Sequence, residues 1–147
     1  MLQIIRGRHP EEGQDQPSIY LIRIVLTPRT RWGQLFFHIF LRGDIDPDPH
    51  DHPWDFWTFP LGRYTEEVVN PMGQVYRNVV RPLHWHHRSA TYIHRVLPRR
   101  DGSTFPWCTI VWHGPYKRHW GFWVQETWPG SEPRRLWVYW KHYLGVK

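Results

Sequence analysis

Short apolar segments separated by turn-forming residues recur along the chain, and they constrain its fold more than any other feature. Most of these segments are rich in β-branched and aromatic residues, which favour strands, and proline, glycine or asparagine stands between them. Such a series predicts an all-β sandwich or barrel rather than a parallel α/β sheet, and its spacing fits a jelly roll. The expected strands cover residues 18–27, 34–42, 56–61, 64–69, 75–81, 91–97, 107–113 and 120–126.

The C-terminal residues show the clearest helical pattern. Trp137, Trp140 and Leu144 would share one face of a helix over residues 133–144, because they are spaced at i, i+3 and i+7. We therefore expect a short C-terminal helix or turn that caps the sheet. The sequence has no repeat, no low-complexity segment and no long linker, so one domain is expected over residues 1–147.

The charge of the chain is basic but dispersed. Its 147 residues include 19 lysines and arginines against 13 aspartates and glutamates, a net charge of +6. The cations stand singly or in pairs, so a solvated basic surface is expected and nucleic acid is not an expected partner. The single cysteine excludes an internal disulfide, and no apolar stretch is long enough for a signal peptide or a membrane span. We expect a cytoplasmic protein without a membrane partner.

A His-x-His pair lies in the most polar segment of the chain, residues 44–55. In an extended chain, residues i and i+2 project from the same face, so His50 and His52 point one way together. Two imidazoles so placed can bind a divalent metal if a third ligand arrives from elsewhere. His94 is the first candidate, because the strand expected over residues 91–97 fixes its direction. Spacing leaves other candidates open, namely His84, His86 and His87.

The polar segment and His94 together resemble the two-motif arrangement of the cupin superfamily. The first cupin motif places His-x-His and an acidic residue between two glycines, and the second ends with a histidine on a strand. Residues 43–62 match the first motif and residues 81–96 match the second. The residues around His50 are also similar to those of small single-domain cupins, some of them phage-encoded. The resemblance implies a cupin-type jelly-roll barrel and a divalent metal bound by His50, His52, His94 and Asp55.

The acidic position departs from the family pattern. It holds Asp55 rather than glutamate, and it follows His52 by three residues, which is the wrong parity for a continuous strand. A bulge at Pro53 would restore its direction. Otherwise the resemblance implies either a site of histidines with open positions or an Asp55 carboxylate that accepts a hydrogen bond from a ligand ring.

Catalytic candidates come from the expected strands near these motifs. Either Glu66 or Glu67 faces inward if the strand over residues 64–69 is regular, and an inward Glu66 near a metal is a candidate general base. Arg81 suits an anionic substrate through bidentate contact, as does Arg95.

Other histidines and tryptophans are interpreted as structural. His38 lies in the middle of an aromatic strand, so we expect a hydrogen-bonded core residue. A group of tryptophans is expected to be mainly core, with one or two members at the barrel mouth: Trp54, Trp57, Trp112, Trp120 and Trp123.

The cupin resemblance implies a metal-dependent enzyme, most simply a non-haem iron oxygenase that uses Fe(II) and binds a small-molecule substrate in the barrel. Isomerase or lyase chemistry with Mn²⁺, Ni²⁺ or Zn²⁺ uses nearly the same ligands and stays open. A third interpretation is a non-catalytic cupin that binds a sugar, a nucleotide-like ligand or a protein partner. Cupins commonly associate through sheet edges, so a homodimer is expected.

Overall fold

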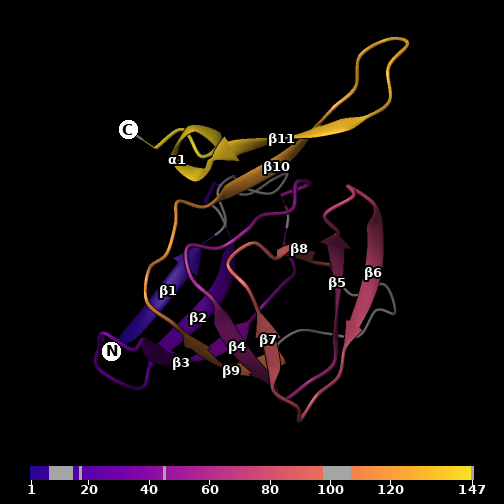
Figure 1. Cartoon of the computed structure of the whole chain (residues 1–147). Helices are drawn as coiled ribbons and strands as arrows, with labels where there is room; N and C mark the ends of the chain where they lie inside the picture. Colours follow the sequence, from indigo (N-terminus) through magenta and orange to yellow (C-terminus); the bar gives the residue numbers. More distant parts are fainter. Residues whose placement is uncertain (7–14, 17, 45, 98–106, 147) are drawn as a thin grey trace.

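The computed structural model describes residues 1–6, 15–16, 18–44, 46–97 and 107–146. Within these residues the chain consists mostly of strands, as predicted (Figure 1). No helix among them is long and apolar enough to cross a lipid bilayer. The elements are β1 (Leu2–Arg6), β2 (Ile19–Val25), β3 (Gln34–Phe40), β4 (Phe56–Pro60), β5 (Tyr64–Val69), β6 (Val75–Val80), β7 (His86–Arg88), β8 (Ile93–Val96), β9 (Trp107–His113), β10 (Gly121–Glu126), β11 (Arg134–Tyr139) and α1 (Trp140–Tyr143).

Two antiparallel sheets enclose the core. The first has six strands in the order β1-β2-β3-β9-β4-β7. The second contains β6-β5-β8 and the ribbon β10-β11, which lies at one end of the molecule in Figure 1. Backbone bridges join His50 to His94 of β8 and to Phe122 of β10. The chain around His50 therefore completes the second sheet, and the architecture is the predicted all-β jelly roll with a short C-terminal helix.

The expected strands are all present, with ends that differ by a few residues, and β1, β7 and β11 are additional. The helix predicted over residues 133–144 is wrong for most of its length, because residues 134–139 form β11 and only residues 140–143 are helical. The β11 segment is rich in residues that favour strands, and it pairs with the whole of β10 from Gly121 to Glu126. Pairing with a neighbouring strand thus outweighs the helical spacing of the tryptophans.

Alternation along the strands separates core from surface. On β3, Phe36, His38 and Phe40 face inward. Trp107 of β9 lies between Phe40 and Tyr64, with ring centroids 4.2 and 4.3 Å away and nearly parallel planes. Because Tyr64 belongs to β5, this stack ties the two sheets together.

The tryptophans expected in the core are only partly buried. Trp57 is 36% exposed, and the deeply buried tryptophan is Trp107 instead. Two members of the expected group, Trp54 and Trp120, line the interior cavity, which agrees with the prediction for one or two of them. The half-buried members of the group are Trp54, Trp112, Trp120 and Trp123.

Candidate metal centre

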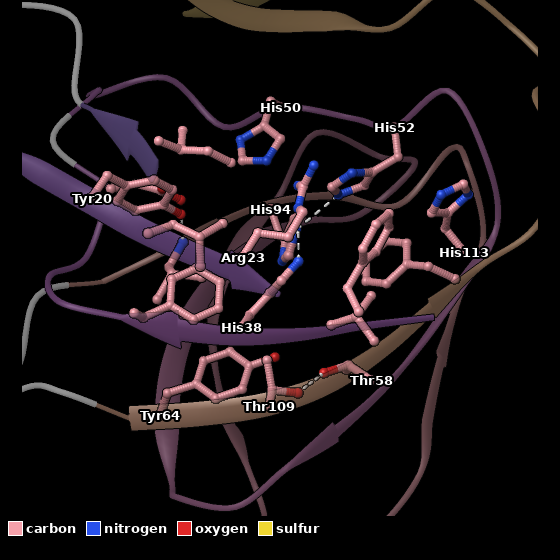
Figure 2. A pocket seen from close by; sticks show the side chains of 18 of the residues that line it. Tyr20, Arg23, His38, His50, His52, Thr58, Tyr64, His94, Thr109 and His113 are labelled. Carbon is pink, nitrogen blue, oxygen red and sulfur yellow. Dashed lines mark hydrogen bonds between the residues drawn. The ribbon is translucent and has the colours of Figure 1, made fainter. Parts of the chain in front are cut away.

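His50, His52 and His94, here called the histidine triad, meet inside the barrel (Figure 2). One ring nitrogen of each lies within 4.8 Å of the others, and the ring centroids are 5.0 to 5.3 Å apart. His50 and His52 point the same way, as their spacing predicted. No cysteine or carboxylate among the described residues joins this group. The structure therefore brings together the predicted histidines alone.

Backbone hydrogen bonds fix the segment that carries the first two histidines. The His50 amide donates to the His94 carbonyl at 2.9 Å, and the His94 amide donates back at 3.0 Å. On the other side, the Trp123 amide donates to the Pro49 carbonyl at 2.8 Å. Residues from both cupin-like motifs are thus held in one sheet.

Asp51 anchors the same segment from the opposite face. Its carboxylate is fully buried, yet it accepts hydrogen bonds on both oxygens. Oδ1 accepts from the Gly121 amide at 2.8 Å. Oδ2 accepts from Arg118 Nη1 at 3.0 Å and from the indole N–H groups of Trp123 and Trp137 at 3.2 and 3.1 Å. These donors satisfy the buried charge, and because side chains alternate, they also direct His50 and His52 into the barrel.

Glu66 orients the third histidine. Its Oε2 lies 2.6 Å from Nδ1 of His94, and the carboxylate is fully buried. Burial acts to raise the pKa of Glu66, but the hydrogen bond with His94 and the charge of Arg88 outweigh it and lower the pKa to about 2. Glu66 is therefore an ionised acceptor. Its Oε1 accepts from Arg88, Tyr92 and Asn78 at 3.0, 2.6 and 2.9 Å.

This contact fixes the tautomer of His94. Because ionised Glu66 accepts from Nδ1–H, the Nε2 atom of a neutral His94 ring carries a lone pair. That atom lies 2.9 Å from Nε2 of His52, so the two nitrogens converge on one point. A carboxylate behind a histidine, with the far nitrogen directed at a shared point, is the arrangement that metal-binding histidines adopt.

Burial keeps the other rings neutral. It lowers the pKa of His50 to about 4, an effect that the charge of Asp44 partly offsets. It also lowers the pKa of His52 well below its usual value, and the neighbouring His94 and His50 rings add to the shift. Neutral imidazole is the form that binds a divalent cation, so burial prepares His50 and His52 as nitrogen ligands.

The structure places Asp55 away from the triad. Its carboxylate accepts from the Ala90 amide at 2.9 Å and pairs with Lys117 at 2.5 Å. These hydrogen bonds, from Lys117 first and from Ala90 second, lower the pKa of Asp55. Residues 51–55 form a loop with a bend rather than a strand, and Glu66 rather than Asp55 binds a triad ring.

The other candidates also occupy different places from those predicted. Arg81 is exposed and, together with His84, lines a surface pocket outside the barrel. The ring of His86 is 2.9 Å from the Arg81 carbonyl oxygen, so it belongs to the same outer region. Arg95 pairs with Glu67 at 3.0 Å. Glu66 does face inward, but its hydrogen bonds are all directed at protein groups, which suits a positioning residue rather than a general base.

A cavity of about 420 Å³ opens beside the triad (Figure 2). Aromatic side chains form much of its wall, and its polar groups include Arg23, His38 and a buried pair of threonine hydroxyls 2.6 Å apart, Thr58 and Thr109. Nε2 of His38 accepts from Arg23 at 3.0 Å, which confirms the predicted hydrogen-bonded core histidine. The cavity has the size of a small-ligand site.

No protein-family model and no curated protein matches the chain. Several solved structures do. Hydroxypropylphosphonic acid epoxidase from S. wedmorenis is similar over 64% of this chain and 51% of its own, at 12% identity and a TM-score of 0.50. A putative mannose-6-phosphate isomerase from Ralstonia eutropha is similar over 74% of this chain and 99% of its own, at 20% identity and a TM-score of 0.50. A cupin domain from Bordetella pertussis is similar over 69% and 98%, at 17% identity and a TM-score of 0.47.

The fold is a cupin fold. The chain spans about half the length of the epoxidase chain, at 51%, and nearly all of the putative isomerase chain, at 99%. Identities this low establish the fold alone, so the chemistry of the site has to be argued from the residues of this chain.

Two residues near this site were missed from the sequence. Asp51 was assigned a direction but no partners, because its donors come from residues 118–137, far away along the chain. The sequence gives one weak indication for Arg23, because it is a charged residue in the middle of an apolar strand. It stands two residues after the buried Leu21 and therefore faces the same side of the strand.

Proposed function

We propose that this cupin is a metal-dependent enzyme, a non-haem iron oxygenase that holds Fe(II) in the histidine triad and acts on a small organic substrate in the barrel. The observation that supports it most is the position of His94, whose Nδ1 is bound by Glu66 while its Nε2 faces His52. A structure of FeII HppE shares the fold over 76% of this chain and 56% of its own, at 12% identity and a TM-score of 0.53, which favours iron among the possible metals.

The residues present fit such an ion. The triad offers neutral nitrogens and no thiolate, and it meets at the wall of a cavity that a substrate can enter. When bound, Fe(II) on histidine ligands keeps positions open for substrate and dioxygen. Glu66 holds the proton on His94 Nδ1, Asp51 holds the segment that carries His50 and His52, and the aromatic wall limits the access of water.

The metal content of protein purified without added metal tests this proposal. We expect close to one iron per chain, lost in His50→Ala and His94→Ala, and oxygen uptake with at least one member of a panel of small organic acids. His119→Ala is the matched control, because that ring bonds Tyr116 on the surface. Protein that binds no metal, with an unchanged fold in His50→Ala, would overturn the proposal.

The same experiment separates the alternative chemistries. Stoichiometric Zn²⁺, Mn²⁺ or Ni²⁺ without oxygen uptake would replace the oxygenase with an isomerase or lyase, in which the metal acts as a Lewis acid. We also propose that the protein works in the cytoplasm as a homodimer. Light scattering coupled to size exclusion checks the dimer, for which the expected mass is twice 18.0 kDa.

A further inference from the structure

An arginine side chain lies inside the barrel, on the wall of the cavity that contains the triad. Arg23 is in the middle of β2, and the register of β2 and β3 places it opposite His38. Its neighbour on the same face, Leu21, is 4% exposed, and His38 is 7% exposed. Arg23 and the histidine triad line one continuous space (Figure 2).

Within the part of the chain that the structure describes, the charge of Arg23 has no counterion. Nε donates to Nε2 of His38 at 3.0 Å, and the guanidinium lies 4.7 Å from the centroid of the Phe36 ring. Among the described residues, no carboxylate pairs with Arg23 and no acceptor binds its terminal Nη groups. Asp44 also lines the cavity, but its Oδ2 accepts from the Val96 amide at 2.7 Å.

Arg23 is itself half-buried, and a charge that is partly removed from water is costly unless something pairs with it. Burial lowers the pKa of Arg23, yet arginine stays protonated in proteins, so the cation remains. Buried charges are normally paired and hydrogen-bonded. The neighbouring triad offers no compensation, because it contains no carboxylate and an ion bound there would add further positive charge.

The geometry of the Arg23 guanidinium indicates which kind of ligand would pair with it. His38 binds the Nε side, which leaves the two Nη groups as a free fork, and a fork of this kind binds a planar or tetrahedral oxyanion through parallel hydrogen bonds. We propose that Arg23 binds the anionic group, a carboxylate or a phosphonate, of a small organic acid whose other end lies toward the histidine triad. His38 is the positioning residue that holds the fork in place. This inference rests on the proposed function, since it names the substrate class of the same site.

Binding of small anions to the full chain tests the inference. The probes are benzoate and methylphosphonate, which separate the two anion classes, with benzamide as the neutral counterpart of benzoate. We expect at least one anion to bind and Arg23→Gln to weaken it roughly ten- to hundredfold, the range of hydrogen bonds to charged groups. Arg31→Gln removes the same charge from an exposed residue that stacks on Trp32, and it should leave binding unchanged.

Several outcomes would overturn the inference: benzamide binding as tightly as benzoate, neither anion binding, or Arg23→Gln and Arg31→Gln having equal effects. If Arg23→Gln does not fold, Arg23→Lys keeps the charge without the fork and should still weaken the anion severalfold. Each titration is run on chelator-treated and on metal-loaded protein. Anion binding through Arg23 without any metal binding would reject the oxygenase alone, whereas metal binding with no response to Arg23 would reject this inference alone.

Discussion

Glu66 and His94 form a buried carboxylate–histidine pair, with Oε2 of Glu66 2.6 Å from Nδ1 of His94. The pair spans neighbouring strands, because β5 and β8 are hydrogen-bonded and place Glu66 two residues along from the partner of His94. Arg88, Tyr92 and Asn78 hold the carboxylate on its other oxygen. The orientation of the His94 ring therefore depends on residues outside the His-x-His pair of His50 and His52.

Replacing Glu66 with glutamine should weaken metal binding by roughly ten- to hundredfold, as is typical when a partner of a ligand histidine is changed. The glutamine removes the negative charge that makes His94 a better ligand, and its amide can present a donor to Nδ1. Competition with a chromophoric chelator measures the affinity. Glu67→Gln is the matched control, since Glu67 pairs with Arg95 at 3.0 Å on the other face of β5. Equal losses in both variants would contradict the assigned role.

Asp51→Asn should destabilise the fold by about 2–4 kcal/mol, because Oδ2 receives three donors and an amide nitrogen in its place would face them unpaired. Urea unfolding of the chelator-treated protein measures the free energy. Asp48→Asn makes the same charge change on the same segment, where the carboxylate has weaker contacts to Gln125 and Tyr143 at 3.4 and 3.1 Å. That variant should lose no more than about 1 kcal/mol. A loss in Asp51→Asn as small as in Asp48→Asn would argue against the anchor.

The spacing of residues along the chain predicted those features of the site that depend only on the alternation of side chains within a strand. Alternation of side chains placed His50 and His52 on one face, and regular strands placed His94 and one of the adjacent glutamates inside. The same argument indicated that a continuous strand would turn Asp55 away. Parity does not explain its position, because residues 51–55 form no strand, and the Asp55 carboxylate is held instead by Lys117 and the Ala90 amide.

Spacing along the chain could not predict the contacts between segments that lie far apart in the sequence. The partners of Asp51 lie 67 to 86 residues further along the chain, so no spacing rule links them. Arg81 and Arg95 were named as candidates for an anionic substrate, whereas Arg23 stands in a strand with apolar residues on both parities, which conceals its direction. The C-terminal strand was missed for the same reason, since its pairing partner β10 decides its structure.

Asp55→Asn should leave metal affinity within about twofold of the parent, because its carboxylate bonds Lys117 and Ala90 and not the triad. The ion pair with Lys117 is partly exposed, so the loss of stability should stay below about 1 kcal/mol. The chelator competition and the urea series used above provide both values. A large drop in metal affinity would show that Asp55 does reach the metal when the ion is bound.

The stability of the chelator-treated protein should fall as the pH drops below 6.5, in part because of His38. Burial, followed by the charges of Arg23 and His113, lowers the pKa of His38 in the folded protein to about 3. Between that value and the ordinary pKa of about 6.5, the unfolded chain binds a proton that the folded chain does not. His38 alone therefore removes up to about 1.4 kcal/mol of unfolding free energy per pH unit in this interval and contributes no slope above it.

His38→Gln isolates this contribution. Glutamine keeps an acceptor for Arg23 Nε but does not titrate. The difference between the two proteins therefore cancels the contributions of the other histidines whose pKa is lowered, His50, His52 and His113, which act in the same direction. We expect the variant to lose less stability between pH 6.5 and 4.5 than the parent, by about 2 to 3 kcal/mol at the lower pH. Urea unfolding at closely spaced pH values measures the slopes. Parallel slopes would mean that His38 is protonated in the folded protein, and that Arg23 is held by something other than its Nε2 lone pair.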